Sequence, residues 1–352
     1  MTAKTEQTIA RLDTLLDDSI AAVFALAEAD ALPLGDDTLP LYDVLRYHLG
    51  FLDADLRPER GDMGKRMRPK LCAYSCLAAG GALEQAVPVA AAIELLHNFT
   101  LVHDDIQDRS LLRRHRPTVW SRWGEAQAIN AGDAMFVLAH LALNLLSDEQ
   151  IDPSVIVRLS TALHHTTLRI VEGQVLDLSF EPRLDVTTTE YLRMISGKTV
   201  DIFQYATWAG AQVAGAGNDR ATRFGDFGRA LGTAFQLHDD ILGIWGPSNA
   251  TGKDAGDIAR RKKTYPVVLL FERADADDRE RLFSLYADDE IDAAGQANVL
   301  RLMDEYDIRH DAEDEVRRWH ARARAALDVA QPVQPGRSLL EDVLRQLEVR
   351  TK

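Results

Sequence analysis

Apolar residues recur at intervals of three and four along nearly the whole chain, which is the spacing of one face of an α-helix. The clearest cases are the stretches at 87–106, 127–146 and 154–180. Strict alternation of apolar and polar residues over the length of a strand is hard to find. The pattern therefore predicts an all-α protein.

Short stretches rich in glycine, proline and charge interrupt this pattern at 32–40, 57–69, 110–118, 181–186 and 245–263. None is long or flexible enough to be a convincing linker, and no repeat of solenoid period appears. We therefore expect a single helical domain over 1–352. Its motifs lie in a core from about 40 to 270. We expect its helices from about 275 to 352 to pack against this core and shield it, without taking part in the chemistry. A second, small C-terminal lobe is the alternative.

The composition of the chain disfavours some classes of function. The formal net charge of -15 disfavours a nucleic-acid-binding surface, because phosphate-backbone affinity needs cations spread over a broad face. A small phosphorylated substrate remains compatible, since the basic residues gather in short clusters. No apolar run approaches a membrane span and no signal peptide is evident, so we expect a cytoplasmic protein. The two cysteines, Cys72 and Cys76, fit core packing better than a disulfide or a zinc site.

Two aspartate clusters stand out, in "LVHDDIQDRS" at 101–110 and "QLHDDILGIWG" at 236–246. On a helix Asp104 and Asp108 share one face, whereas Asp105 points about 100° away. Like charges one turn apart destabilise a helix unless a cation lies between them, and carboxylates without cysteine suit Mg²⁺. The second cluster offers Asp239 and Asp240, but Gly243 occupies the position that matches Asp108.

The histidines before these clusters, His103 and His238, are expected to be hydrogen-bonded core residues, because Mg²⁺ has little use for imidazole. Four basic clusters accompany the aspartates, at 64–69, 111–118, 196–199 and 251–264. Arginine recognises phosphate oxygens in pairs and lysine acts as a movable charge, so the clusters together indicate a site for more than one phosphate. The complete P-loop string is absent, which disfavours a P-loop kinase or ATPase.

Over residues 40 to 270 the chain resembles the trans-isoprenyl diphosphate (polyprenyl) synthases. The matching motifs, in order, are "GKRMRP", "ELLHNFTLVHDDIQD", "LLRRHRPT", "GDAM", "EGQVLDL", "SGKT", "FQLHDDILG" and "TGKDAGDIARRKKTYP". The resemblance implies an all-α isoprenoid-synthase bundle around a central active-site cavity. It also implies a homodimer, and about three Mg²⁺ ions that bind with an allylic diphosphate. The reaction it implies is condensation of isopentenyl diphosphate with a C5 to C15 allylic diphosphate.

The resemblance also implies a role for each site residue. Asp104 and Asp108 would be the metal ligands of the first motif and Asp239 that of the second, supported by Asp105 and Asp240. The residues implied to bind isopentenyl diphosphate are Lys65, Arg68, His97 and Arg114. Those implied to face the allylic diphosphate are Arg113, Lys198, Lys253 and Lys262. Lys198, Thr199 and Gln236 would be the catalytic residues. The departure from the family is Gly243, where a third aspartate is common.

Product length depends on the helix that carries the first motif. Thr100 lies one turn and Leu96 two turns from Asp104, while Phe99 is offset to a neighbouring face. An aromatic residue five positions before the first aspartate resembles the archaeal geranylgeranyl diphosphate synthases, so we expect a C20 product. A farnesyl or longer product is the alternative, if Phe99 is ordinary core packing and another helix limits the length.

Two other functional classes are alternatives to a prenyl synthase. A class I terpene cyclase would carry an Asn/Asp, Ser/Thr, Glu metal motif in place of the second aspartate cluster, which "DDILGIWGP" does not. A regulatory subunit without catalysis would have lost aspartates or basic residues, whereas this chain retains both sets.

Overall fold

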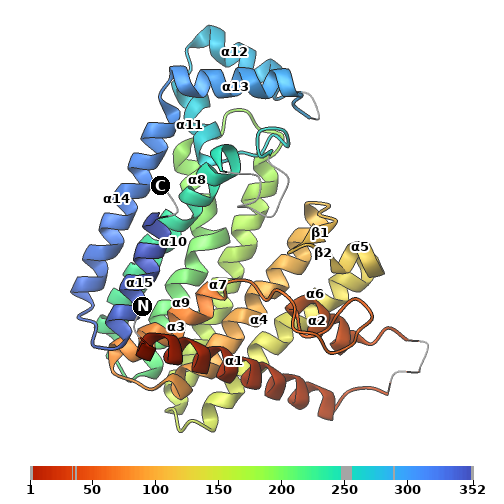
Figure 1. The fold of residues 1–352 in the computed structure, drawn as a ribbon, viewed down its shortest axis with the longest axis vertical. Helices are drawn as coiled ribbons and strands as arrows, with labels where there is room; N and C mark the ends of the chain where they lie inside the picture. The colour runs from red at the N-terminus through yellow and green to blue at the C-terminus, as the bar shows by residue number, and fades with distance from the viewer. Residues whose placement is uncertain (1–2, 34, 36–37, 247–255, 288–289, 350–352) are drawn as a thin grey trace. The chain divides into compact units, whose positions relative to one another are not determined.

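The computed structural model describes residues 3–33, 35, 38–246, 256–287 and 290–349, and these residues are mostly helical (Figure 1). The α-helices are α1 (Ala3–Ala29), α2 (Leu41–Leu49), α3 (Met67–Ala79), α4 (Leu83–Gln107), α5 (Val119–Trp123), α6 (Glu125–Ala142), α7 (Pro153–Phe180), α8 (Thr188–Ile195), α9 (Asp201–Val213), α10 (Asn218–Trp245), α11 (Tyr265–Arg273), α12 (Ala276–Leu285), α13 (Ala293–Glu305), α14 (Ile308–Val329) and α15 (Gly336–Val349). The all-α prediction is confirmed.

Two further helical turns and one hairpin complete the described elements. A 3₁₀ turn at Leu143–Ser147 follows α6, and a π-helical turn at Ser196–Val200 joins α8 to α9. The strands β1 (Leu112–Arg113) and β2 (Arg116–Pro117) pair antiparallel, with Arg113 opposite Arg116. The hairpin therefore forms within a stretch that the sequence predicted only as an interruption of helix.

The chain divides into two compact units. Unit 1 comprises Met1–Ala162, Ala206–Ala221 and Pro332–Leu340; unit 2 comprises Leu163–Tyr205, Thr222–Gln331 and Glu341–Lys352. The expectation of one functional domain stays a prediction. The alternative of a second, small C-terminal lobe likewise stays a prediction.

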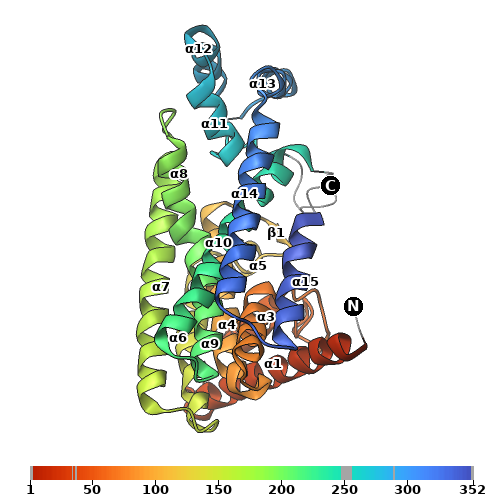
Figure 2. The same ribbon diagram turned by 90° about the vertical axis from the view of Figure 1, so that its left-hand side faces the viewer.

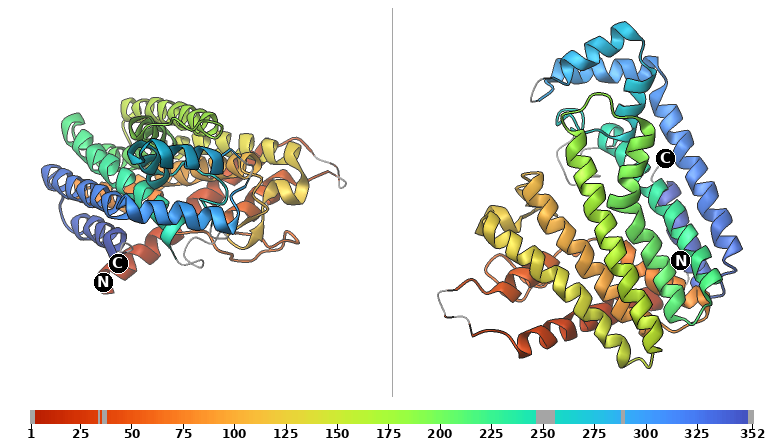
Figure 3. Two further views of the ribbon diagram at one scale, coloured as in Figure 1. Left: turned by 90° about the horizontal axis from the view of Figure 1, so that it is seen from above. Right: turned by 180° about the vertical axis from the view of Figure 1, so that it is seen from behind.

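Unit 1 is built around α4. This helix runs side by side with α6 in both the front and the rear views (Figures 1 and 3), and α3 and α1 also pack against it. Its apolar side chains Ile93, Leu95 and Leu96 are fully buried. Cys72 and Cys76 of α3 are buried free thiols, as predicted, and burial raises the pKa of Cys76 to about 12.

Two helices of unit 1 are long and apolar enough to span a membrane by length and composition alone, Leu83–Gln107 and Glu125–Ser147. This corrects the expectation that no apolar stretch reaches that length. Packing within the unit accounts for the first, because 72% of its most apolar stretch is buried. The corresponding stretch of the second is only 44% buried, so α6 keeps an exposed apolar face.

Unit 2 has its own core, which includes Leu237 of α10, Leu270 of α11, Met303 of α13 and Val316 of α14. Figure 2 shows α11 beside α14, with α12 and α13 beyond their ends. Proline at the second position of α11 suits this start, because the first backbone N–H groups of a helix need no partner within it. The core places the end of α10, with its aspartates, next to the start of α11.

Candidate functional site

The first aspartate cluster lies in the last turn of α4. The Asp105 side chain is 2% exposed and that of Asp104 is 21% exposed, so the two neighbouring carboxylates face different surroundings. The helix ends at Gln107, and Asp108, which follows it, is exposed while its backbone N–H still donates to Asp104 O at 2.8 Å. Helix geometry predicted that Asp105 would point about 100° away from Asp104, and in the structure Asp105 is the one of the two that is buried.

Arg113 holds Asp105 in place. Its Nε donates to Asp105 Oδ2 at 2.8 Å and its Nη2 to Oδ1 at 2.7 Å, a bidentate pair. The same Nη2 lies 3.6 Å from Asp104 Oδ2. Arg113 was predicted to face an allylic diphosphate, and in the structure its Nε and Nη2 are engaged with Asp105.

The β1–β2 hairpin explains why two adjacent arginines emerge here. Its central residues, Arg114 and His115, have φ angles of 51° and 62°, so both lie in the left-handed region. Positive φ at both central positions characterises the tightest hairpin turns. Arg113 therefore reaches Asp105 of α4, while Arg114 enters the neighbouring basic cluster, where burial lowers the pKa of its guanidinium.

This basic cluster joins three of the residues predicted to bind isopentenyl diphosphate. Arg68 Nη1 lies 3.0 Å from His97 Nε2. Burial, together with the charges of Arg68 and Arg114, lowers the pKa of His97 well below its usual value, so the imidazole is neutral near pH 7. Lys65, the fourth predicted residue, is exposed.

A buried carboxylate, which the sequence reasoning missed, lies among these cations. Glu94 is 3% exposed and accepts a hydrogen bond from Asn98 Nδ2 at 3.0 Å. Burial raises the pKa of Glu94, while the charges of Arg66 and Arg114 oppose that rise. Glu94 and Asn98 both belong to α4 and lie one turn apart on the same face. This spacing is a signal in the sequence that could have identified the pair.

The segment around Lys65 is anchored by α1. Arg66, at φ 48° and 7% exposed, pairs with Asp17 Oδ1 at 2.6 Å, and Lys70 Nζ lies 3.3 Å from Asp13 Oδ1. Asp13 and Asp17 are one helical turn apart on α1, outside the stretch that carried the sequence motifs. Arg66 is thus a structural anchor within a cluster predicted as a whole to bind phosphate.

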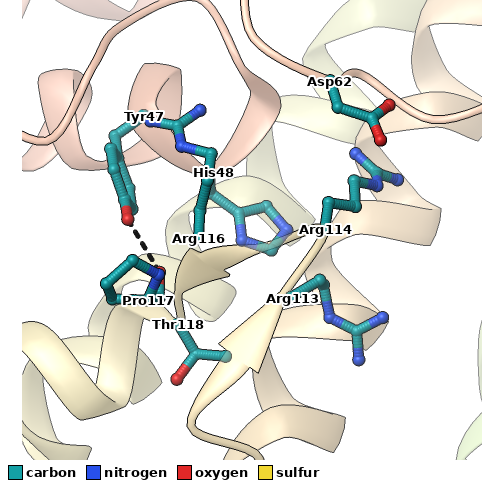
Figure 4. Close-up of a pocket in the computed structure, with 8 residues that line it drawn as sticks. All are labelled: Tyr47, His48, Asp62, Arg113, Arg114, Arg116, Pro117 and Thr118. Carbon is teal, nitrogen blue, oxygen red and sulfur yellow. Dashed lines mark hydrogen bonds between the residues drawn. The ribbon is translucent and has the colours of Figure 1, made fainter. Parts of the chain in front are cut away.

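A small pocket opens beside the hairpin (Figure 4). Arg116 stacks over the Tyr47 ring at 4.1 Å and donates to Leu52 O at 2.5 Å, and the Tyr47 hydroxyl donates to Pro117 O at 2.7 Å. These contacts tie α2 to the hairpin. The pocket is lined by Tyr47, His48, Asp62, Arg113, Arg114, Arg116, Pro117 and Thr118.

In unit 2 the second aspartate cluster repeats the division between its two carboxylates. Asp239 is exposed, whereas Asp240 is 4% exposed. Asp240 accepts hydrogen bonds from the Tyr191 hydroxyl, from Tyr265 N at 3.0 Å and from Gln236 Nε2 at 3.0 Å. Burial raises the pKa of Asp240 to about 7, although these hydrogen bonds favour its charged form. Neither tyrosine was predicted to be a site residue: Tyr191 carries no local sequence signal, and Tyr265 lies at the end of a quoted motif but was given no role.

The three predicted catalytic residues belong to the same unit. Thr199 Oγ1 donates to Gln236 Oε1 at 2.8 Å, which extends the Asp240 network, and Lys198 Nζ lies 2.5 Å from Asp177 Oδ2. Lys262 is exposed, and its charge helps to keep the pKa of Asp240 from rising further. Lys253 lies outside the described residues.

The π-helical turn at Ser196–Val200 follows from a close approach of two backbones. A Cβ on Gly173 of α7 would lie 2.2 Å from Lys198 N, and one on Gly197 would lie 2.5 Å from Arg169 O. Two glycines therefore let the turn that carries Lys198 and Thr199 press against α7. Such turns widen a helix locally and often occur at functional sites.

Substitution Gly173→Ala should displace this turn. We expect a loss of about 1–3 kcal/mol in the free energy of unfolding from overpacking, and a lower kcat because Lys198 moves. Urea unfolding and steady-state assays would measure both. The matched control is Gly217→Ala, where an added Cβ has no atom within 4 Å; equal behaviour of the two variants would contradict the expectation.

The position of the absent third aspartate is filled from elsewhere in the chain. An ideal Cβ on Gly243 would lie 2.0 Å from Asp257 Oδ2, so the Asp257 carboxylate occupies the space of a side chain at 243. Asp257 also accepts from Arg260 Nη2 at 3.2 Å. A side chain at 243 would therefore displace the Asp257 carboxylate, and the second cluster has a nearby carboxylate that its local sequence lacks.

The two cluster histidines differ from each other. His238 is 2% exposed, as predicted for a core residue. His103 is not in the core: its side chain is 27% exposed and its Nε2 lies 3.4 Å from Ile129 O and 3.8 Å from Asp133 Oδ1. It packs edge-on against Phe99 at 5.0 Å.

The residues predicted to limit product length have distinct surroundings. Leu96 is fully buried, and Thr100 Oγ1 donates to His97 O at 2.7 Å. The Phe99 ring, half-buried, lies 5.2 Å from the Phe136 ring of α6. Phe99 therefore contacts a second aromatic residue on a neighbouring helix.

The donor set suits Mg²⁺. Among the described residues no three histidine, cysteine, aspartate or glutamate side chains converge as a complete metal cage. Mg²⁺ usually takes one or two protein carboxylates and completes its shell with water and substrate phosphate, so it needs no such cage. Asp104 is partly exposed and Asp108 and Asp239 are exposed, so each presents the type of ligand that this coordination uses.

The sequence of the chain is similar to those of known prenyl synthases. The sequence profile of the family described as Polyprenyl synthetase matches residues 60–303. A (2E,6E)-farnesyl diphosphate synthase of Mycobacterium tuberculosis is 43% identical over 226 residues, 64% of this chain and 62% of that protein. A geranylgeranyl diphosphate synthase of the same species is 44% identical over 239 residues, 67% of each chain. The chain thus spans less than two thirds of the first of these relatives.

Structural similarity covers more of the chain. The crystal structure of a polyprenyl synthetase from Streptomyces coelicolor A3(2) matches with a TM-score of 0.84 at 35% identity, over 96% of this chain and 98% of that one. The similarity therefore extends well beyond the residues that carry the motifs.

Proposed function

Because the chain belongs to the polyprenyl synthetase family, we propose that it condenses isopentenyl diphosphate with an allylic diphosphate, releasing inorganic diphosphate and a trans-prenyl diphosphate five carbons longer. The observation that carries this proposal lies within unit 1. One hairpin sends Arg113 to the carboxylates at the end of α4 and Arg114 into a cluster with Arg68 and His97. The same hairpin therefore supports both the carboxylates suited to a metal ion and the basic cluster suited to an anion.

In the proposed reaction, side chains of the protein would stabilise the negative charge on the departing diphosphate and the positive charge on the allylic fragment. Lys198 and Arg113 supply fixed positive charge for a departing diphosphate, and a site closed to water strengthens that effect. Thr199 donates its hydroxyl hydrogen to Gln236, so its oxygen lone pairs remain available to an allylic cation. Asp104, Asp108 and Asp239 would hold Mg²⁺, which when bound neutralises diphosphate charge. Attack by the double bond of isopentenyl diphosphate and loss of one proton complete the balance.

The test is an incubation of purified protein with Mg²⁺, isopentenyl diphosphate and, separately, C5, C10 and C15 allylic diphosphates. Products are sized by chromatography after phosphatase treatment. Longer allylic alcohols that require isopentenyl diphosphate would support the proposal. Cyclic hydrocarbon formed without isopentenyl diphosphate would instead indicate a cyclase, and the absence of turnover with every primer would overturn the enzymatic assignment.

We further propose a C20 product, because Phe99 adds a bulky ring near the first aspartate motif and packs against Phe136. The relatives named above include both a farnesyl and a geranylgeranyl diphosphate synthase at nearly equal identity. The proposal of a C20 product therefore rests only on the Phe99 and Phe136 side chains. Substitution Phe99→Ala should lengthen the main product by at least one C5 unit, measured by the same chromatography.

Phe136→Ala provides the matched comparison. An unchanged product from Phe99→Ala together with a longer one from Phe136→Ala would move the length limit to α6. Unchanged products from both would reject this aromatic pair as the floor.

We also propose that the protein is a homodimer that uses α6. Ile129 and Val137 of α6 are 46% and 53% exposed and lie about two turns apart. Exposed apolar surface of this kind favours association with a partner.

A further inference from the structure

His48 lines the small pocket beside the hairpin, yet none of the roles described above uses it. Figure 4 shows its imidazole turned toward Arg114, with Arg113 and Arg116 on the neighbouring strands. Asn98 of α4 is a hydrogen-bonding neighbour of the His48 ring, whereas the Nε2 atom is inaccessible to water and has no hydrogen-bond partner of its own among the described residues. A buried polar atom without a partner destabilises the free protein, and native structures rarely keep one without a reason.

The surroundings of His48 are those of an anion site. The charged and titratable groups that face it come from α4, the hairpin and the segment before α3, and they are His97, Arg113, Arg114, Arg116 and Asp62. The guanidinium groups donate hydrogen bonds and accept none. A ligand that enters here must therefore offer acceptor oxygens and negative charge, as a phosphate does.

The protonation state of His48 is compatible with such a ligand. Burial, together with the charges of Arg113 and Arg114, lowers the pKa of His48 to about 3, so the ring is neutral in the free protein. A neutral imidazole adds no further repulsion to the arginines. It can carry its hydrogen on Nε2, and negative charge from a phosphate would favour that form.

We propose that His48 is a binding residue for the diphosphate group of isopentenyl diphosphate and that its Nε2–H donates to a phosphate oxygen. The proposal rests on the function proposed above and adds a fifth side chain to the four predicted from the motifs. Arg114 links the two sets, because it lines the pocket with His48 and also acts on His97.

Direct titration of the full chain with isopentenyl diphosphate, without an allylic substrate, tests the proposal. His48→Leu keeps an apolar side chain of similar bulk but removes the donor, and should raise Kd by about tenfold to a hundredfold. His48→Gln, which restores an N–H donor, should recover most of that loss. In turnover, KM for isopentenyl diphosphate should rise in parallel, while KM for the allylic diphosphate stays within about twofold.

Tyr47→Phe is the matched control, because it removes the hydrogen bond to Pro117 from the wall of the same pocket without removing a group that faces the anion. An unchanged Kd in His48→Leu would overturn the role of His48 and leave the proposed function standing. Equal weakening by all three substitutions would also overturn it, since general damage to the pocket would then explain the loss. Absence of both wild-type binding and turnover would overturn the proposed function, and the inference with it.

Discussion

Asp104→Asn should lower kcat by about 10³-fold while leaving stability nearly unchanged. The substitution removes the charge of a carboxylate that is 21% exposed and keeps its size, so the loss falls on charge stabilisation in the reaction. Steady-state assays at saturating Mg²⁺ and both diphosphates would measure kcat, and urea unfolding would measure stability.

The neighbouring positions make the result specific. Asp105→Asn should destabilise the protein, because the buried Asp105 pairs with Arg113. Asp148→Asn removes an exposed acid that follows the 3₁₀ turn after α6 and lies outside the predicted site, and should leave kcat within about twofold. If Asp104→Asn retains wild-type turnover, the first cluster does not hold the catalytic metal.

Arg113→Met should cost about 3–5 kcal/mol in the free energy of unfolding. The substitution removes the bidentate hydrogen bonds that the Asp105 carboxylate, 2% exposed, accepts from Arg113. Turnover should fall as well, since the end of α4 loses its fixed cation. Urea unfolding monitored by circular dichroism would give the stability change.

A double-mutant cycle separates the pair from its surroundings. Arg113→Met combined with Asp105→Asn leaves no buried charge and should recover a large part of the stability lost in Arg113→Met. Arg109→Met is the control, because its ion pair with Glu125 is exposed on both sides and should contribute at most about 1 kcal/mol. Similar losses for Arg109→Met and Arg113→Met would refute the buried-pair argument.

The parts of the site predictable from sequence are those set by local geometry. Helix spacing alone separates Asp104 from Asp105, and the structure buries the one that was predicted to turn away. Gln236 and Asp240 are likewise one turn apart, and their hydrogen bond follows from that spacing. Such relations depend on only a few consecutive residues.

The parts not predictable are contacts between distant segments. Nothing near Asp17 indicates that it will neutralise Arg66, and nothing near Tyr191 indicates a hydrogen bond to Asp240. His48 lies in a short helix without a motif, and its importance appears only when the hairpin folds against it. Local periodicity carries no information about these pairings, because they depend on how whole helices pack.

The burial of both cysteines has a practical consequence. Cys72 and Cys76 are the only cysteines of the chain, and both thiols are inaccessible with raised pKa values, so neither forms a reactive thiolate near neutral pH. A cysteine introduced at Leu111, which is 63% exposed next to the hairpin, would be the one thiol open to a maleimide dye. Fluorescence from that dye could follow substrate binding in real time in a protein that keeps its native cysteines.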